Sequence, residues 1–182
     1  MTSSKGDALA LDESESIVVV KDREALEELR AIGEQIAVSV VRELPGWAQR
    51  EVERILDAWN RLEDGARADA VDRAYRSGER AADRIGRELR ELINQDPGDQ
   101  SGTPLQIVRE AYREPTAVLR ELGIAEIVRD PFEERAFPHD GYGLAPKALN
   151  DLGDPDAGPL MLAWGLAKAR VLRIRADSAR ER

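Results

Sequence analysis

The sequence predicts an all-α protein, and two observations support that fold class. Charged residues make up 35% of the 182 residues and aromatic residues only 4%, a composition rich in strong helix formers. Apolar residues recur at intervals of three and four along most of the chain, which is the spacing of one helical face. No cysteine is present, so disulfides, thiolate metal sites and thiol nucleophiles are excluded.

Residues 1–20 are predicted to form a disordered acidic leader. The first sixteen residues are small, polar and acidic, and no basic segment precedes an apolar one, so they do not form a secretory signal. The β-branched run Ile17–Val20 is interpreted as an edge strand or as an apolar staple ahead of the first helix. Lys21-Asp22 then supplies a cap for that helix.

A helical hairpin is predicted over residues 21–94. Apolar positions from Asp22 to Leu44 mark one helical face. Pro45-Gly46 is expected to end this first helix, because proline lacks the N–H group that the helix needs. A second helix is expected from Trp47 to Asn94, with a break or kink near Asp64–Gly65.

The two helices of this predicted hairpin differ about twofold in length at 1.5 Å per residue. The outer half of the second helix therefore lacks a partner within the hairpin. Its apolar residues are expected to face the C-terminal helix, the helix over 103–122 or a second copy of the chain, and we predict a homodimer. The residues predicted for self-association are Val71, Ile85, Leu89 and Leu92.

The turn-forming segment 95–102 is predicted to be a linker to a helical second half over 103–176. Thr103-Pro104-Leu105-Gln106 has the pattern of a capping box with proline at the first helical position. The helix that begins there is expected to run to Leu122, to kink or divide at Pro115, and to stop at Gly123.

A last helix is predicted to open at Gly158-Pro159. Residues 160–167 are apolar nearly all round, so this part should be central to a core or an interface. Residues 177–182 are predicted to be a frayed basic tail. The second part of the helix carries a possible basic arm, which consists of Arg170, Arg173 and Arg175.

The loop predicted over 130–146 is the most informative segment. It holds three of the eight aromatic residues, three prolines and the only histidine. A long loop with aromatic residues is expected to be ordered and functional. We predict that it binds a protein partner, and the alternative is that its phenylalanines plug a gap between helices. The predicted partner-binding residues are Phe132, Glu133, Glu134, Phe137, His139 and Tyr142.

Several short motifs of the second half suggest a family. They are Thr103-Pro104, Arg129–Glu134, Phe137-Pro138, Tyr142–Leu144 and Ala163–Gly165. Over about 103–170 the chain resembles a family of small uncharacterised proteins of GC-rich, actinobacterial-type bacteria. This resemblance implies a bacterial source and no particular function.

The leading prediction is a non-enzymatic, cytoplasmic interaction or adaptor protein that binds a protein partner and self-associates. No catalytic residue, metal ligand or cofactor is predicted, and no apolar run approaches the roughly 18 residues of a membrane span. One alternative is a nucleic-acid-associated accessory factor that uses the basic arm, although a net charge of -9 opposes phosphate binding. The other is a metal-dependent enzyme with ligands from Glu133, Glu134 and His139.

Overall fold

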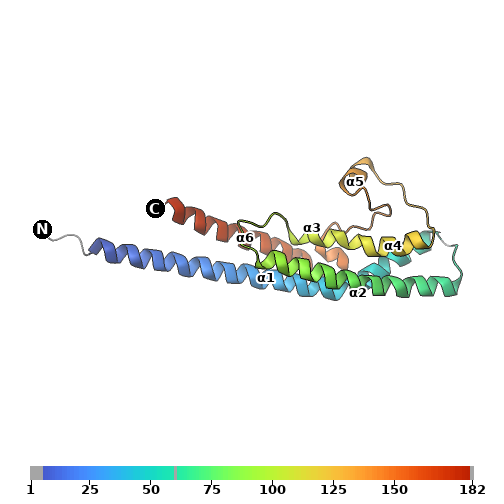
Figure 1. Ribbon diagram of the computed structural model, residues 1–182, viewed down its shortest axis with the longest axis horizontal. Helices are drawn as coiled ribbons and strands as arrows, with labels where there is room; N and C mark the ends of the chain where they lie inside the picture. The colour runs from blue at the N-terminus through green and yellow to red at the C-terminus, as the bar shows by residue number, and fades with distance from the viewer. Residues whose placement is uncertain (1–5, 60, 181–182) are drawn as a thin grey trace.

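Figure 1 shows a computed structural model of the chain, which describes residues 6–59 and 61–180. The described residues are all-α, which confirms the predicted fold class, and they contain no strand. The long helices α1, α2 and α6 lie alongside one another, α3 and α4 cover α2, and α5 stands off this bundle (Figure 1). The helices are α1 (Gly6–Trp59), α2 (Asp64–Asn94), α3 (Pro104–Arg109), α4 (Arg113–Glu121), α5 (Pro131–Ala136) and α6 (Ala157–Arg180), with 3-10 turns η1 (Glu110–Tyr112) and η2 (Leu149–Leu152).

Helix α1 begins well before the start predicted at Asp22. Residues 6–20, expected to be a disordered leader, lie in this helix, and Ile17–Val20 is one of its turns rather than a strand. Packing against α6 accounts for the last part of this segment, because Val18 and Val19 lie beside Ile174 and Ser178 and Arg175 binds the adjacent Asp22 at 2.7 Å. Helices draw most of their stability from such packing, which local propensity does not reveal. Residues 1–5 of the predicted leader lie outside the described residues.

Helix α1 also continues through Pro45, so the stop predicted at Pro45-Gly46 is wrong. A proline inside a helix costs about 3 kcal/mol, because it lacks an N–H and crowds the preceding turn. Leu44, Trp47 and Ala48 are buried around it, and burial of each large apolar side chain contributes about 1.5–3 kcal/mol. Packing therefore outweighs the local penalty. The cyan part of α1, which follows Pro45, leaves the line of the blue first part (Figure 1).

The chain reverses direction between the end of α1 at Trp59 and the start of α2 at Asp64, next to the break predicted near Asp64–Gly65. Helix α1 accordingly has 54 residues and α2 has 31, or about 81 Å and 47 Å. This order of lengths is the opposite of the predicted one. The unmatched length of the hairpin belongs to the first part of α1 and not to α2.

The residues predicted for self-association are covered by the chain itself. Ile85, Leu89 and Leu92 are buried and Val71 is half-buried. Ile85 and Leu89 belong to a core shared by α1, α2, α3 and α6. Val71 packs against a second cluster, which contains residues of α1, α2 and α4. A dimer through these residues would have to open a close-packed core. The prediction that they form a self-association surface is therefore wrong.

Helices α1 and α2 approach closely because α2 presents small side chains to α1. The buried small residues of α2 are Ala70, Ala74, Ser77, Gly78, Ala81, Ala82 and Gly86. A Cβ atom added at Gly78 would lie 2.6 Å from the Cα of Pro45 and 2.7 Å from the carbonyl oxygen of Leu44. These distances are shorter than van der Waals contact, so the two helix backbones touch where α1 passes through its proline.

The second half begins as predicted. The hydroxyl of Thr103 accepts the N–H of Gln106 at 3.4 Å, and the side chain of Gln106 accepts the N–H of Thr103 at 2.9 Å, which confirms the capping box. The predicted helix is divided just ahead of Pro115 by η1. Gly123 follows α4 with a φ of +68°, which confirms the predicted stop.

Helix α6 joins the two halves of the chain that the linker was expected to separate. Trp164, Ala167 and Val171 of α6 pack in the same core as Leu29 and Ile36 of α1. The helix continues to Arg180, so residues 177–180 do not form a frayed tail. Residues 181 and 182 lie outside the described residues.

We predict that Gly78→Ala lowers the free energy of unfolding by about 1–3 kcal/mol, because the added methyl meets backbone atoms that cannot move aside. The measurement is urea denaturation followed by circular dichroism. Gly65→Ala is the matched control on the same helix, since no atom lies within 4 Å of its added Cβ. That variant should be neutral or stabilised by up to about 1 kcal/mol. Equal stability of the two variants would contradict the close approach.

Candidate protein-interaction site

The segment 124–147 forms a small lobe, named the α5 lobe here, that projects from the bundle (Figure 1). It contains all of the loop predicted over 130–146, and one part of that loop is the helix α5. No residue of α5 is buried. The lobe is therefore held to the bundle by residues on either side of α5.

Two aspartates shape the backbone of the α5 lobe. Asp130 caps α5, because its Oδ1 accepts the N–H groups two and three residues further on, at 2.8 and 2.9 Å. Asp140 is buried, and its two oxygens accept the N–H groups four and five residues further on, at 2.9 and 2.8 Å. Both carboxylates are used to build the lobe.

Tyr142 anchors the α5 lobe in the core. Its side chain is fully buried in the cluster that also contains Tyr112 and Leu119. Its hydroxyl donates a hydrogen bond to the carbonyl oxygen of Ile124 at 2.6 Å, and burial raises the pKa of the phenol. Tyr142 is thus inaccessible to a partner, which corrects its prediction as a partner-binding residue.

Two arginines fasten the other side of the α5 lobe. The guanidinium of Arg109, on α3, lies 5.7 Å from the centre of the half-buried Phe137 ring and donates to the carbonyl oxygen of Pro146 at 3.2 Å. Arg129 donates to the carbonyl oxygen of Phe137 at 2.6 Å. Phe137 therefore packs against the guanidinium of Arg109 at the edge of the lobe. It does not fill a gap deep between the helices.

A cleft of about 550 Å³ opens between α5 and these arginines. Glu133 in this cleft pairs with Lys147 at 3.0 Å, and its carboxylate raises the pKa of Lys147. Phe132 lines the same cleft and is largely exposed. The cleft is lined by Arg109, Arg129, Asp130, Phe132, Glu133, Ala136, Phe137, Asp140, Gly143, Ala145, Pro146 and Lys147.

The structure brings together part of the predicted partner-binding set. Phe132, Glu133 and Phe137 line the cleft, whereas Glu134 and His139 are exposed and do not line it. Within residues 6–59 and 61–180, no three His, Asp or Glu side chains are grouped so that they could hold a metal ion. The geometry thus gives no support to a metal site at Glu133, Glu134 and His139.

The predicted basic arm on α6 is engaged with acidic residues of the same chain. Arg175 pairs with Asp22 at 2.7 Å and with Asp96 at 2.7 Å, and it holds the pKa of Asp96 below its usual range. Arg170 pairs with Glu28 at 2.8 Å, while Arg173 is exposed. Two of the three cations are therefore partly neutralised, which weakens attraction to phosphates.

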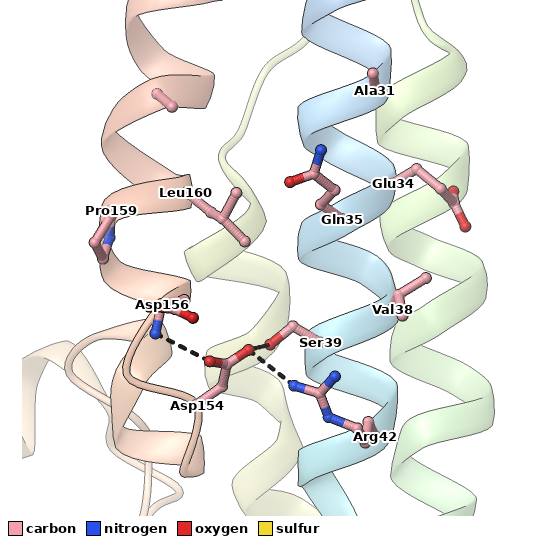
Figure 2. Close-up of a pocket in the computed structure, with 11 residues that line it drawn as sticks. Ala31, Glu34, Gln35, Val38, Ser39, Arg42, Asp154, Asp156, Pro159 and Leu160 are labelled. Atoms are coloured by element: carbon pink, nitrogen blue, oxygen red, sulfur yellow. Dashed lines mark hydrogen bonds and ion pairs between the residues drawn. The ribbon is translucent and has the colours of Figure 1, made fainter.

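A second surface feature, unforeseen from the sequence, is a shallow groove of about 860 Å³ between α1 and α6 (Figure 2). At one end, the carboxylate of Asp154 accepts hydrogen bonds from Ser39 at 2.5 Å, Arg42 at 2.9 Å and the N–H of Asp156 at 2.9 Å. Ser39, the N–H of Asp156 and Arg42 together hold the pKa of Asp154 below its usual range. Ser39 and Asp154 are 115 residues apart, so no local pattern could have revealed the groove.

Comparisons with known proteins identified no related protein. No known protein family, no curated protein and no solved structure matches the chain. The resemblance of residues 103–170 to a bacterial family stays a prediction. None of the described helices is both long enough and apolar enough to cross a membrane.

We predict that Asp154→Asn lowers the melting temperature at pH 7 and that this deficit shrinks below about pH 4. The folded-state pKa of Asp154 is depressed, so its carboxylate stabilises the fold above the unfolded pKa, and this contribution is lost as the pH falls through the folded pKa. Differential scanning calorimetry from pH 3 to 7 measures the deficit. Asp69→Asn is the control, since its nearest cation is 3.9 Å away. A deficit that stays constant with pH would contradict the assignment.

Proposed function

We propose that the chain is a non-enzymatic interaction protein that binds a protein partner through its α5 lobe. The observation that carries this proposal is the placement of Phe132, whose side chain is 72% exposed on a helix without a buried residue. A phenylalanine that contributes little to its own core is available to fill a pocket on another protein. Buried aromatic anchors of this kind dominate the energy of many protein interfaces.

The α5 lobe supports the proposal because its shape is fixed before any partner binds. Asp130 caps the helix that carries Phe132, Asp140 holds the following turn, and Tyr142 ties that turn to the core. A preformed surface loses little conformational entropy on association. The polar residues of the loop therefore act as a scaffold for the exposed ring.

The surroundings of Phe132 indicate the chemistry of the partner. Ile127 and Val128 precede the lobe helix and are also exposed, Val128 completely. Among the nearby charges, Glu133 is already paired with Lys147. The lobe thus offers apolar side chains, and its five acidic residues outnumber its three basic ones, so we expect a partner with an apolar pocket rather than a polyanion.

The nucleic-acid alternative has less support. The chain carries a net charge of -9, and Arg170 and Arg175 are paired with acidic side chains. Two arginines of α2 are likewise paired with glutamates of α4, Arg73 with Glu121 and Arg84 with Glu114. A cytoplasmic location is part of the same proposal, since a chain without cysteine is compatible with a reducing compartment.

We predict that a photo-crosslinking amino acid at position 132 captures one discrete heterologous protein in the cells that make this chain. The same group at position 75 is the control, because Tyr75 is an exposed aromatic residue on α2, away from the lobe. Adducts are identified by mass spectrometry after a purification under denaturing conditions. The proposal fails if position 132 gives no adduct, or if both positions give the same ones.

A companion variant separates binding from folding. Phe132→Ala should leave the free energy of unfolding within about 0.5 kcal/mol of the wild-type value, because the ring is exposed. It should nevertheless lose the partner captured at a second lobe position, for which residue 128 is suitable. A large loss of stability would show that the ring belongs to the core and would contradict its role as an anchor.

A further inference from the structure

We propose that the cleft beside α5 binds a carboxylate joined to an apolar group, from the last residue of a protein chain or from a free organic acid. Arg109 and Arg129 hold the carboxylate, and the rings of Phe132 and Phe137 contact the apolar group. In its peptide form this proposal rests on the proposed function, because it names the part of the partner that the α5 lobe recognises. As a site for a free acid it stands on the cleft alone.

The two arginines of the cleft differ from the other half-buried arginines. Within the part of the chain that the structure describes, Arg109 and Arg129 hydrogen-bond only to backbone carbonyl oxygens. A half-buried cation without a carboxylate is incompletely compensated for its lost hydration, and an anion from outside the chain would supply the missing charge. The other half-buried arginines of the described segments, each of which pairs with a carboxylate, are Arg67, Arg73, Arg84 and Arg175.

Both guanidinium groups retain N–H groups for a ligand. A guanidinium carries several N–H donors in one plane. Arg109 uses its Nε and Nη2 groups on backbone carbonyl oxygens, and Arg129 uses its Nη1 group. Arg109 also packs on the Phe137 ring, and Arg129 donates to the carbonyl oxygen of the same residue. The two cations therefore flank one residue of the cleft and are held in place before a ligand binds.

The acidic residues of the cleft are already engaged within the α5 lobe. Glu133 pairs with Lys147 at 3.0 Å. Both oxygens of Asp140 accept backbone N–H groups, and Oδ1 of Asp130 caps α5. The hydrogen-bonding groups that remain for a ligand are therefore mainly donors, which match the oxygen atoms of a carboxylate.

The charge balance of the cleft favours a carboxylate over a phosphate. The lining contains three basic and three acidic residues. The two arginines without an acidic partner can hold one negative charge, whereas a phosphate dianion would bring a second charge close to three carboxylates. The cleft therefore suits a ligand with a single negative charge.

The rest of the lining indicates an apolar group next to that charge. Two aromatic rings and small apolar side chains are suited to a branched aliphatic or aromatic group, and the volume of about 550 Å³ is that of a small-ligand site. Phe132 is 72% exposed, so the cleft is open on its side and leaves room for the rest of a peptide chain. The apolar lining residues are Phe132, Ala136, Phe137, Ala145 and Pro146.

The test is a two-dimensional NMR titration of the ¹⁵N-labelled full chain with matched acids and amides. The peptide probes are decapeptides of glycine and serine that end in leucine, valine or phenylalanine, each as the free acid and as the amide. The small probe is N-acetylphenylalanine, with its amide. At least one acid should shift the amide signals of residues 129–147 with a Kd of about 100 µM or tighter, and its amide should bind about tenfold more weakly or worse.

The two sources of the carboxylate are separated by the same titrations. If a protein terminus is the ligand, the decapeptide that ends in phenylalanine should bind about tenfold more tightly than N-acetylphenylalanine, because further residues of the peptide contact the lobe. Equal binding of the two acids identifies a free organic acid as the ligand. Either result supports the carboxylate site.

Two alanines of the α5 lobe provide a matched pair of variants. Both are exposed, but Ala136 lines the cleft and Ala125 does not. Ala136→Glu should weaken binding of the acid by about tenfold or more, because it adds a negative charge to the cleft, whereas Ala125→Glu should bind like the wild type. Arg109→Gln and Arg129→Gln should each weaken binding by a similar factor.

Thermal melts by circular dichroism accompany all four variants. Because Arg109 and Arg129 also hold the lobe together, the alanine pair decides the outcome if an arginine variant melts at a lower temperature. The proposal is overturned if no acid binds with a Kd below about 1 mM, if the amides bind as well as the acids, or if Ala136→Glu binds like Ala125→Glu.

These outcomes are distinguishable from failure of the proposed function, which is tested by capture at position 132 in cells. A protein captured there whose binding is unchanged by amidation or removal of its last residue would retain the α5 lobe as an interaction surface. It would overturn the peptide form of the carboxylate site.

Discussion

The contact between Gly78 of α2 and Pro45 of α1 is the constraint on which the rest of the fold depends. With no side chain at Gly78, the two backbones come closer than any Cβ would allow, and the neighbouring alanines of α2 continue this close packing. Leu44, Trp47 and Ala48 are buried around the proline, so α1 gains more by continuing than by stopping. The chain therefore turns after α1 has reached Trp59, and the length of the first helix is tied to the packing of Gly78 against Pro45.

The surroundings of α1 and α2 follow from this arrangement. Because α1 extends past the end of α2, its first part packs against α6. Arg175 stabilises that contact through ion pairs with Asp22 and Asp96. One helix covers only part of another, so Ile17, Val19 and Val20 of α1 remain exposed. At the other side of the bundle, α3 and α4 cover α2 and carry the α5 lobe, where Tyr142 is buried and Phe132 is exposed. The molecule thus carries the α5 lobe as a projection from its helical bundle.

The sequence was sufficient where the cause is local. The fold class follows from apolar spacing, the capping box from Thr103 and Gln106, and the helix end from Gly123. It was insufficient where distant packing decides. Pro45 is a local stop signal that packing in the core overrides, and Ile85 and Leu89 are buried in a core formed with other helices of the same chain rather than by a second copy. Within the site, Phe132 could be predicted from the loop composition, but the burial of Tyr142 and the fastening by Arg109 depend on contacts with remote segments.

The continuity of α1 through Pro45 can be measured directly. Arg30 and Arg54 are both exposed, and pulsed electron paramagnetic resonance gives the distance between spin labels at these two positions. A continuous helix with a bend at Pro45 separates them by about 30–36 Å. A hairpin that turns at Pro45-Gly46 would bring them to within about 20 Å, since packed helix axes are only 8–10 Å apart. We expect the long distance as the single dominant population, and a dominant short distance would contradict the account.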